Sequence, residues 1–304
     1  PDEAIRTNGR SRDLSFAAEH ELFTDFALGI NLTYRNFFDF NWSRPYYPDT
    51  GKALGLNDFV QVGTLPSSVG GVSTGDGAGQ PLYLLNADYT PTSYSIEQPR
   101  DDYGWNYYGM DIVFKKRMSN KWMINGSFTL QKTAMYYGSN GYESDPTQTW
   151  GRDGGASGNR EVRWMFKFQG LYQLPWQVNF AWNFFAREGW VIQEWVDIVD
   201  FNSPSSRDRG TRAYVGKYGD LRLDPWVWMG LRLEKMIDLF ETGRLYFMLS
   251  VFNPLNQSTI VGRQNRDIGT YYPHDDSFIP NPRTFQPSEI MTPRKFKIGV
   301  RFQF

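Results

Sequence analysis

The feature that most constrains this chain is an alternation of apolar and polar residues with a period of two. It runs without a break through the last ten residues, 295–304. Successive side chains of a β-strand point to opposite faces, so such a segment has one apolar and one polar face. The apolar members of this terminal segment are Phe296, Ile298, Val300, Phe302 and Phe304.

The same alternation recurs in segments 26–35, 108–115, 122–131, 163–172 and 178–187. Their apolar rows carry Phe, Tyr and Trp near the ends, as expected when strand ends lie at the two lipid headgroup levels. A soluble sandwich would instead build its inner face mainly from Val, Ile and Leu. The pattern therefore predicts an all-β transmembrane antiparallel barrel, with a soluble sheet protein as the alternative.

Composition agrees with a membrane barrel and narrows the other classes. Aromatic residues make up 17% of the chain while the mean hydropathy is -0.54, because lumenal faces and long loops of a barrel are polar. No run of about 18 apolar residues is present, which argues against a spanning helix. A net charge of -1 argues against a nucleic-acid partner. The absence of cysteine is compatible with passage through an oxidising periplasm.

The lengths of the links between strands predict their direction, because barrel strands alternate short periplasmic turns with long outer loops. Short links occur at 23–25, 119–121, 174–177 and 238–243, and long polar links at 42–80, 138–160, 195–220 and 264–289. Two further crossings at 81–87 and 91–98 are expected to preserve this alternation. The total is about eleven strands, the first starting near Asp13 on the outer side and the last ending in the periplasm.

An odd number of strands cannot close an antiparallel barrel. We therefore expect residues 1–304 to be one unit, the carboxy-terminal half of a barrel of about 22 strands with a plugged lumen. On this interpretation we expect the plug and the amino-terminal strands to be absent from this sequence. The chain begins at Pro1 without an export leader, so we expect either that a leader was removed or that the chain is a fragment.

Three motifs give the chain a family resemblance. Its last strand and terminal Phe304 resemble the signal that outer-membrane proteins present to their insertion machinery. Residues 249–256, Leu-Ser-Val-Phe-Asn-Pro-Leu-Asn, look like the strand exit before the last loop of TonB-dependent receptors. Residues 108–122, from Tyr-Gly-Met-Asp to Lys-Arg-Met-Ser-Asn-Lys-Trp, are similar to a passage of the same receptors, most closely in the Oar-type branch.

The resemblance implies TonB-dependent uptake of a large nutrient across the outer membrane of a Gram-negative-type bacterium. Its implied partners are outer-membrane lipid, the plug and amino-terminal strands of the same receptor, the inner-membrane TonB motor and the barrel assembly machinery. The alternative is a receptor-like barrel that serves as a surface-anchored scaffold for other proteins. A soluble carbohydrate-binding sandwich is a third, weaker interpretation.

The residues expected to contact a ligand lie in the long outer links, where aromatic and basic side chains gather. Such side chains stack on sugars and peptides or pair with anions. They equally suit aromatic girdles and loop packing. The candidates are Trp42, Tyr46, Tyr142, Trp150, Arg152, Arg207, Arg209 and Tyr271.

Catalysis and cofactor binding have little support in the sequence. Metal-ligating groups occur together at His274, Asp275 and Asp276. Adjacent carboxylates in an exposed loop more often contact water than a metal ion, so no metal site is expected. The glycine-rich segments 75–79 and 153–155 lack the Lys-Ser/Thr that a phosphate cradle needs. Neither a Gly-x-Ser-x-Gly elbow nor a zinc-protease motif occurs. We therefore expect no enzyme activity and no cofactor.

Overall fold

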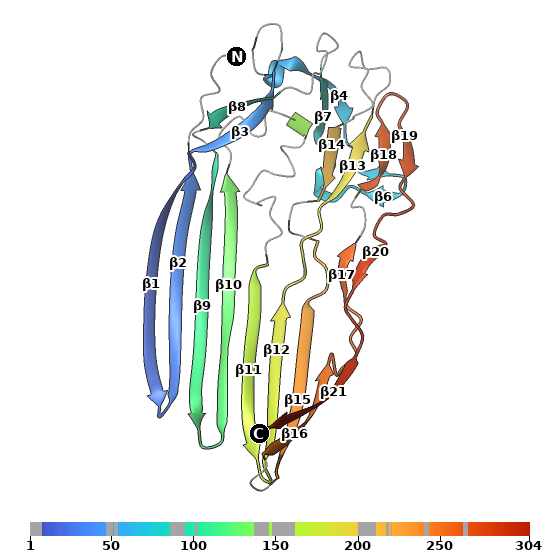
Figure 1. Ribbon diagram of the computed structural model, residues 1–304. Coiled ribbons are helices and arrows are strands. Elements are labelled where there is room, and N and C mark those ends of the chain that lie inside the picture. Colours follow the sequence, from blue (N-terminus) through green and yellow to red (C-terminus); the bar gives the residue numbers. More distant parts are fainter. Residues whose placement is uncertain are drawn as a thin grey trace.

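The computed structural model describes residues 8–46, 51, 54–85, 95–100, 103–136, 146–147, 162–199, 211–216, 219, 221–239, 243–263 and 267–304. Its main element is a nine-stranded sheet in which every neighbouring pair is antiparallel (Figure 1). In spatial order the strands are β1 (Arg10–Phe23), β2 (Phe26–Phe38), β9 (Gly104–Ser119), β10 (Trp122–Tyr136), β11 (Trp164–Leu174), β12 (Val178–Arg187), β15 (Trp226–Asp238), β16 (Arg244–Phe252) and β21 (Lys295–Gln303).

Short turns close one end of this sheet, and the long links gather at the other end, which confirms the predicted alternation (Figure 1). The turn between β9 and β10 has positive φ at both Asn120 (50°) and Lys121 (69°), and the turn between β11 and β12 has it at Trp176 (62°) and Gln177 (60°). Two consecutive left-handed residues match the twist of adjoining strands in a tight hairpin. The last strand ends on the side of these short turns, as expected.

The remaining strands lie among the long links. β3 (Phe40–Pro45) pairs with β8 (Ser95–Arg100), β4 (Phe59–Thr64) with β7 (Pro81–Leu85), β5 (Ser68–Val69) with β6 (Val72–Ser73), and β17 (Ile260–Arg263) with β20 (Pro287–Ile290). A four-stranded sheet contains β14 (Thr211–Val215), β13 (Glu194–Ile198), β18 (Asp267–Tyr272) and β19 (Ser277–Pro280). Two 3-10 helices, η1 (Leu56–Asp58) and η2 (Gly75–Gly77), complete the described elements. None of the described residues form a helix long and apolar enough to cross a membrane.

The structure corrects the predicted strand count from about eleven to nine in the main sheet. Segments 81–87 and 91–98 were expected to cross, but their described parts form β7 and β8, which pair with β4 and β3. A chain that crosses the sheet twice in these segments and a chain that does not cross at all end on the same side. The alternation of short and long links therefore cannot distinguish the two cases. Strand length does distinguish them, because β7 has 5 residues, whereas a tilted transmembrane strand needs about 9–11.

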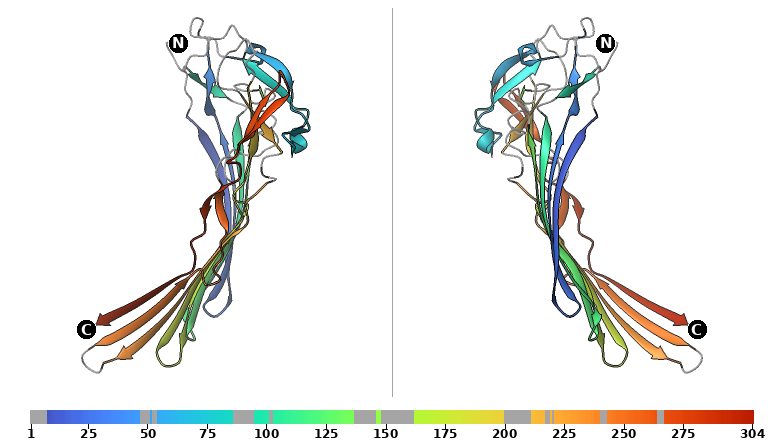
Figure 2. Two further views of the ribbon diagram at one scale, coloured as in Figure 1. Left: turned by 90° about the vertical axis from the view of Figure 1, so that its right-hand side faces the viewer. Right: turned by 90° about the vertical axis from the view of Figure 1, so that its left-hand side faces the viewer.

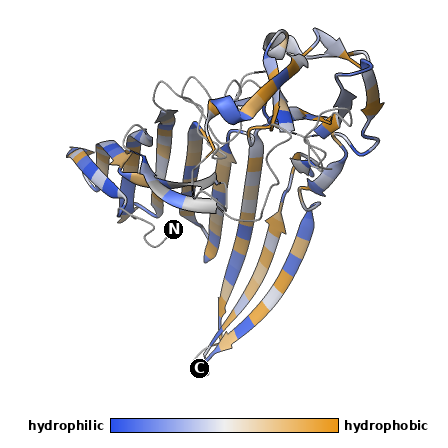
Figure 3. Ribbon diagram, turned by 90° about the horizontal axis from the view of Figure 1, so that it is seen from above, coloured by the Kyte–Doolittle hydropathy of each residue, from blue (hydrophilic) through white to orange (hydrophobic). Residues whose placement is uncertain are grey.

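The registers place all the predicted apolar rows on one continuous face of the sheet. One row of paired residues runs from Phe16 through Leu32, Met110 and Leu130 to Trp164. Another runs from Phe180 through Leu233 and Leu249 to Ile298. Figure 3 shows the resulting bands of hydrophobic and hydrophilic residues along the strands. We call this side the apolar face and the opposite side the polar face.

A buried core exists, but it lies among the long links rather than on the sheet. The four-stranded sheet and the hairpins near it enclose an apolar cluster formed by Leu65, Val69, Leu82, Val196, Ile198, Ala213, Val215, Ile268 and Tyr271. This body, which we call the outer cap, sits at one end of a long, curved and twisted sheet (Figure 2). Edge strands β1 and β21 are paired on one side only within the part of the chain that the structure describes.

Candidate functional site

Large apolar side chains on the apolar face are exposed along much of the sheet. Phe16 is 60% exposed, Phe247 43% and Ile298 79%, although all three belong to long, well-paired strands. A soluble protein seldom leaves such a contiguous apolar surface uncovered. In a soluble sandwich this surface would be packed against a second layer. No described residue forms such a layer.

The five residues of the predicted assembly signal share this exposed surface. Phe296, Ile298, Val300, Phe302 and Phe304 are between 48% and 99% exposed. Strand β21 pairs only with β16 among the described strands, so its other edge offers unpaired backbone groups. Both features suit recognition of a terminal strand by another protein, a role that stays a prediction.

The opposite face is polar near the short turns and through the middle of the sheet. In the middle of the sheet, Asp111 accepts a hydrogen bond from Thr129 on the next strand (2.6 Å). Nearer the outer ends of the first two strands, Arg35 of β2 pairs with Asp13 of β1 (2.7 Å). The second contact is a cross-strand ion pair of the kind expected for charges facing a wet interior. The sequence therefore assigned the two faces correctly in this region.

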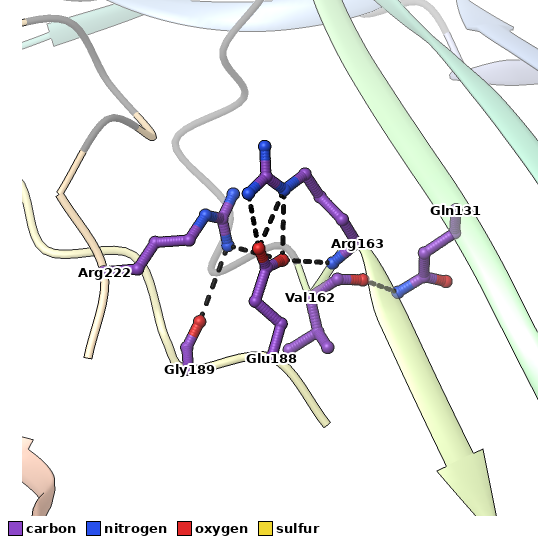
Figure 4. Close-up of polar contacts among 6 residues, drawn as sticks. All are labelled: Gln131, Val162, Arg163, Glu188, Gly189 and Arg222. Atoms are coloured by element: carbon purple, nitrogen blue, oxygen red, sulfur yellow. Dashed lines mark hydrogen bonds and ion pairs between the residues drawn. The ribbon is translucent and has the colours of Figure 1, made fainter. Parts of the chain in front are cut away.

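Near the outer cap, a single carboxylate joins three segments of the chain (Figure 4). Glu188 follows β12, and its Oε2 accepts a hydrogen bond from the Arg163 backbone N–H at 2.9 Å. The Arg163 guanidinium donates to Oε1 (Nε–Oε1 2.9 Å), and Arg222 Nη1 lies 3.1 Å from Oε2. The Glu188 side chain is 9% exposed and that of Arg222 14%. We call this cluster the Glu188 clasp.

Electrostatics keep Glu188 ionised. Burial alone raises the pKa of its carboxyl, but the hydrogen bonds from Arg163 and the charges of Arg222 and Arg163 outweigh it and hold the pKa below its ordinary value. Glu188 lies beyond the last residue of β12, outside the sheet. Arg163 also anchors the neighbouring hairpin, because its carbonyl accepts a hydrogen bond from Gln131 N–H at 2.8 Å.

A close approach of two backbones brings Arg222 to the clasp. Leu223 N–H donates to the Trp190 carbonyl and Ile192 N–H to the Leu221 carbonyl, both at 2.9 Å. A Cβ on Gly189 would come within 1.8 Å of the Leu223 carbonyl oxygen, so only glycine fits there. No pattern in the sequence predicts this cluster, because its members are far apart along the chain.

The predicted ligand-contacting residues fall into three groups. Tyr142, Trp150, Arg152, Arg207 and Arg209 lie outside the described residues. Trp42 is in β3 and Tyr46 follows it, half-buried. Tyr271 is 6% exposed and packs in the core of the outer cap, and its contact with a ligand stays a prediction.

The Tyr271 hydroxyl donates to Asp276 Oδ1 at 2.8 Å. Burial, and then the hydrogen bond to Asp276, raise the pKa of Tyr271 to about 12. Asp275 instead accepts the backbone N–H of Ser277 at 3.0 Å, and His274 Nε2 lies 3.4 Å from Asp275 Oδ2. These contacts stabilise the turn between β18 and β19. Among the described residues, no three metal-ligating side chains come together.

The first asparagine of the 249–256 motif, Asn253, has a clear structural role. Asn253 is 3% exposed, and its amide donates to the carbonyls of Gln257 (2.8 Å) and Thr292 (2.9 Å). Its own carbonyl accepts Gln257 N–H at 2.9 Å. The residue has a φ of 49°, which asparagine tolerates better than most residues. Asn253 thus ties the chain leaving β16 to the chain entering β21.

One feature of the polar face was not expected from the sequence, namely a group of aromatic rings near the outer cap. By register, Phe185, Trp226, Trp228 and Phe252 all lie on this face. Phe185 and Trp226 have ring centroids 5.3 Å apart, and Trp228 and Phe252 6.3 Å. In the sequence, Trp226 and Trp228 alternate with Val227 and Met229. Because all four residues are apolar, the alternation does not show which pair lies on the polar face.

Comparisons with known proteins show a likeness to a solved structure. No family model matches the chain, and no curated protein matches it in sequence. Among solved structures, the chain resembles the outer membrane transporter YddB from Escherichia coli, with a TM-score of 0.51 and 12% sequence identity. The match covers 98% of this chain and 33% of the transporter chain, so this chain spans about a third of that protein's length. At this identity the likeness concerns the fold: the long sheet matches part of an outer-membrane barrel.

Proposed function

We propose that this chain is a carboxy-terminal part of the barrel of a TonB-dependent outer-membrane receptor and serves in the uptake of a large nutrient. The observation that carries the proposal is the continuous, exposed apolar face opposite a charged one. In a barrel wall the apolar face contacts lipid and the polar face lines the interior. The fold likeness to an outer-membrane transporter supports the same assignment. The proposal assigns the chain no enzymatic activity and no cofactor.

Unpaired sheet edges explain why further strands are needed. Each unsatisfied backbone group in hydrocarbon costs several kcal/mol, so edges like those of β1 and β21 do not persist in a bilayer. The nine strands therefore join strands supplied by the rest of the same receptor. A plug from that receptor would fill the interior and couple to the inner-membrane TonB motor. The outer membrane of a Gram-negative-type bacterium is the corresponding location.

Two further partners follow from the exposed surfaces. Lipid covers the apolar face, and the barrel assembly machinery binds the terminal strand through Phe296, Ile298, Val300, Phe302 and Phe304. A second candidate function is a surface-anchored scaffold, in which the barrel presents the outer cap to other proteins. The packed apolar core of that cap favours this alternative, because a rigid surface suits protein binding better than mobile loops do.

Fractionation of cells that make the native polypeptide tests the barrel assignment. The protein should stay in the outer-membrane fraction, require detergent for extraction and change its electrophoretic mobility on heating. Recovery from the soluble fraction without detergent would refute the proposal. Uptake and scaffolding are then separated by deleting the motor: loss of nutrient uptake supports the receptor, whereas unchanged uptake together with retained surface partners supports the scaffold.

A further inference from the structure

The polar face holds a buried cation for which the described residues supply no neutralising carboxylate. The Arg187 side chain, at the outer end of β12, is 8% exposed. Its guanidinium carbon lies 3.9 Å from the centre of the Trp190 ring and 4.9 Å from that of Trp226. Within the described parts of the chain, no carboxylate forms an ion pair with it, and its Nε has no hydrogen-bond partner. Trp226 Nε1 is a second buried donor to which the described residues offer no acceptor.

Each unpaired buried donor costs free energy that a partner would recover. Trp195 Nε1 is a further buried donor for which the described residues supply no partner. Stacking between two indole rings offsets part of the cost for Arg187. This stacking does not use the N–H donors of the guanidinium, which bind most strongly to a carboxylate. A binding partner from outside the described chain therefore explains the arrangement better than packing alone does.

Arg187 and Trp226 also line a pocket of about 340 Å³. Trp190 and Trp228 contribute further aromatic walls, and Val261, Ile290 and Met291 form the apolar side. This volume is near the lower end of the range for small-molecule sites, roughly 300–1,000 Å³, which are mostly apolar with a few fixed polar groups. Of the described residues that line the pocket, Glu289 is the one with a carboxylate, and it is exposed and forms no ion pair with Arg187.

A second cation lies along the same face. Lys167 Nζ is 5.8 Å from the centre of the Phe185 ring, and Phe185 packs against Trp226. The approach to the pocket from the middle of the sheet is therefore positively charged, which raises the local concentration of anions.

We propose that this pocket binds a small organic anion whose carboxylate is held by Arg187 and whose ring stacks against the surrounding tryptophans. The inference concerns binding only and stands whether or not the ligand is transported. It also differs from the ligand contacts predicted from the sequence: among the described residues, Trp42, Tyr46 and Tyr271 do not line this pocket.

Calorimetric titration of the native polypeptide, purified in detergent, tests the proposal with a matched pair of probes. Benzoate and benzamide share ring and shape but differ in charge. Benzoate should bind about tenfold more tightly or better, which is the difference expected for a charged hydrogen bond. Acetate, which has the carboxylate without the ring, should also bind more weakly than benzoate. Equal binding of benzoate and benzamide, or no binding of benzoate, would overturn the proposal. The latter is also the result expected if an acidic side chain elsewhere in the receptor fills the pocket.

Variants locate the binding. Arg187→Gln should abolish the preference for benzoate, and Arg187→Lys should restore part of it. The matched control is Arg12→Gln, which removes an arginine stacked on Phe38 at 4.5 Å, far from the pocket. Heat-dependent mobility reports whether each variant folds. If Arg187→Gln does not fold, Val261→Trp narrows the pocket from β17 without touching the arginine and should abolish benzoate binding. Retained binding in that variant would contradict the assignment.

Discussion

Replacing Phe128 by arginine tests which face of the sheet contacts hydrocarbon. Phe128 lies on the apolar face of β10, six positions beyond Trp122 at the short-turn end of the strand. At about 3.3 Å per residue and a tilt near 40°, that position is roughly 15 Å above the turn. It is thus close to the middle of an apolar layer that is about 25–30 Å thick.

An arginine at this depth on a lipid-facing position costs about 2–4 kcal/mol. The substitution also removes the contact between Phe128 and Phe166, whose ring centroids are 6.4 Å apart. Phe128→Leu removes the same ring contact but stays apolar, so the difference between the two variants measures the cost of the charge. Asn125→Arg places the same side chain on the polar face, opposite Lys115 and Gln169, and should cost less than about 1 kcal/mol.

The measurement is equilibrium unfolding by urea of the native polypeptide inserted in lipid vesicles. We expect the free energy of unfolding to fall in the order Asn125→Arg, Phe128→Leu, Phe128→Arg. If Asn125→Arg and Phe128→Arg were equally destabilising, or if their order were reversed, the apolar face would not be the lipid-contacting face and the barrel proposal would fail.

Three further predictions concern the contacts near the outer cap. Leu82→Ala should destabilise the cap by about 2–5 kcal/mol, because Leu82 is fully buried in its core. Val60→Ala, at an exposed cap position, should have little effect. Limited proteolysis of intact cells measures the stability of the cap in both variants. Glu188→Gln should cost about 1–3 kcal/mol at neutral pH, because it leaves the buried Arg222 without its anion. Folding lowers the Glu188 pKa, so the stabilisation by this carboxylate is complete above its pKa in the unfolded chain, about 4.3. It is lost as the pH falls through the pKa in the folded protein. The free energies of unfolding of the native and variant proteins should therefore converge in acid. Asn253→Ala should speed amide hydrogen exchange in β21 and leave exchange in β1 unchanged.

The sequence predicted the parts of the fold that depend on local periodicity. Alternation fixed the faces of the long strands, since a slip by one residue would turn every side chain to the wrong side. Link length fixed strand direction, as the hairpin at Asn120 and Lys121 illustrates. The same reasoning failed for segments 81–87 and 91–98, because an even number of crossings leaves no trace in the direction of the next strand.

What the sequence by itself determined is a set of antiparallel strands with one apolar and one polar face and a terminal strand of matching pattern. Only the tertiary structure decided where the buried core lies, why Tyr271 packs inside it, and how Glu188 meets Arg163 and Arg222. The physical reason is distance along the chain. Periodicity records what a residue's neighbours in one strand require, whereas the cap, the clasp and the Arg187 pocket join segments that are close only after the long links have folded over the end of the sheet.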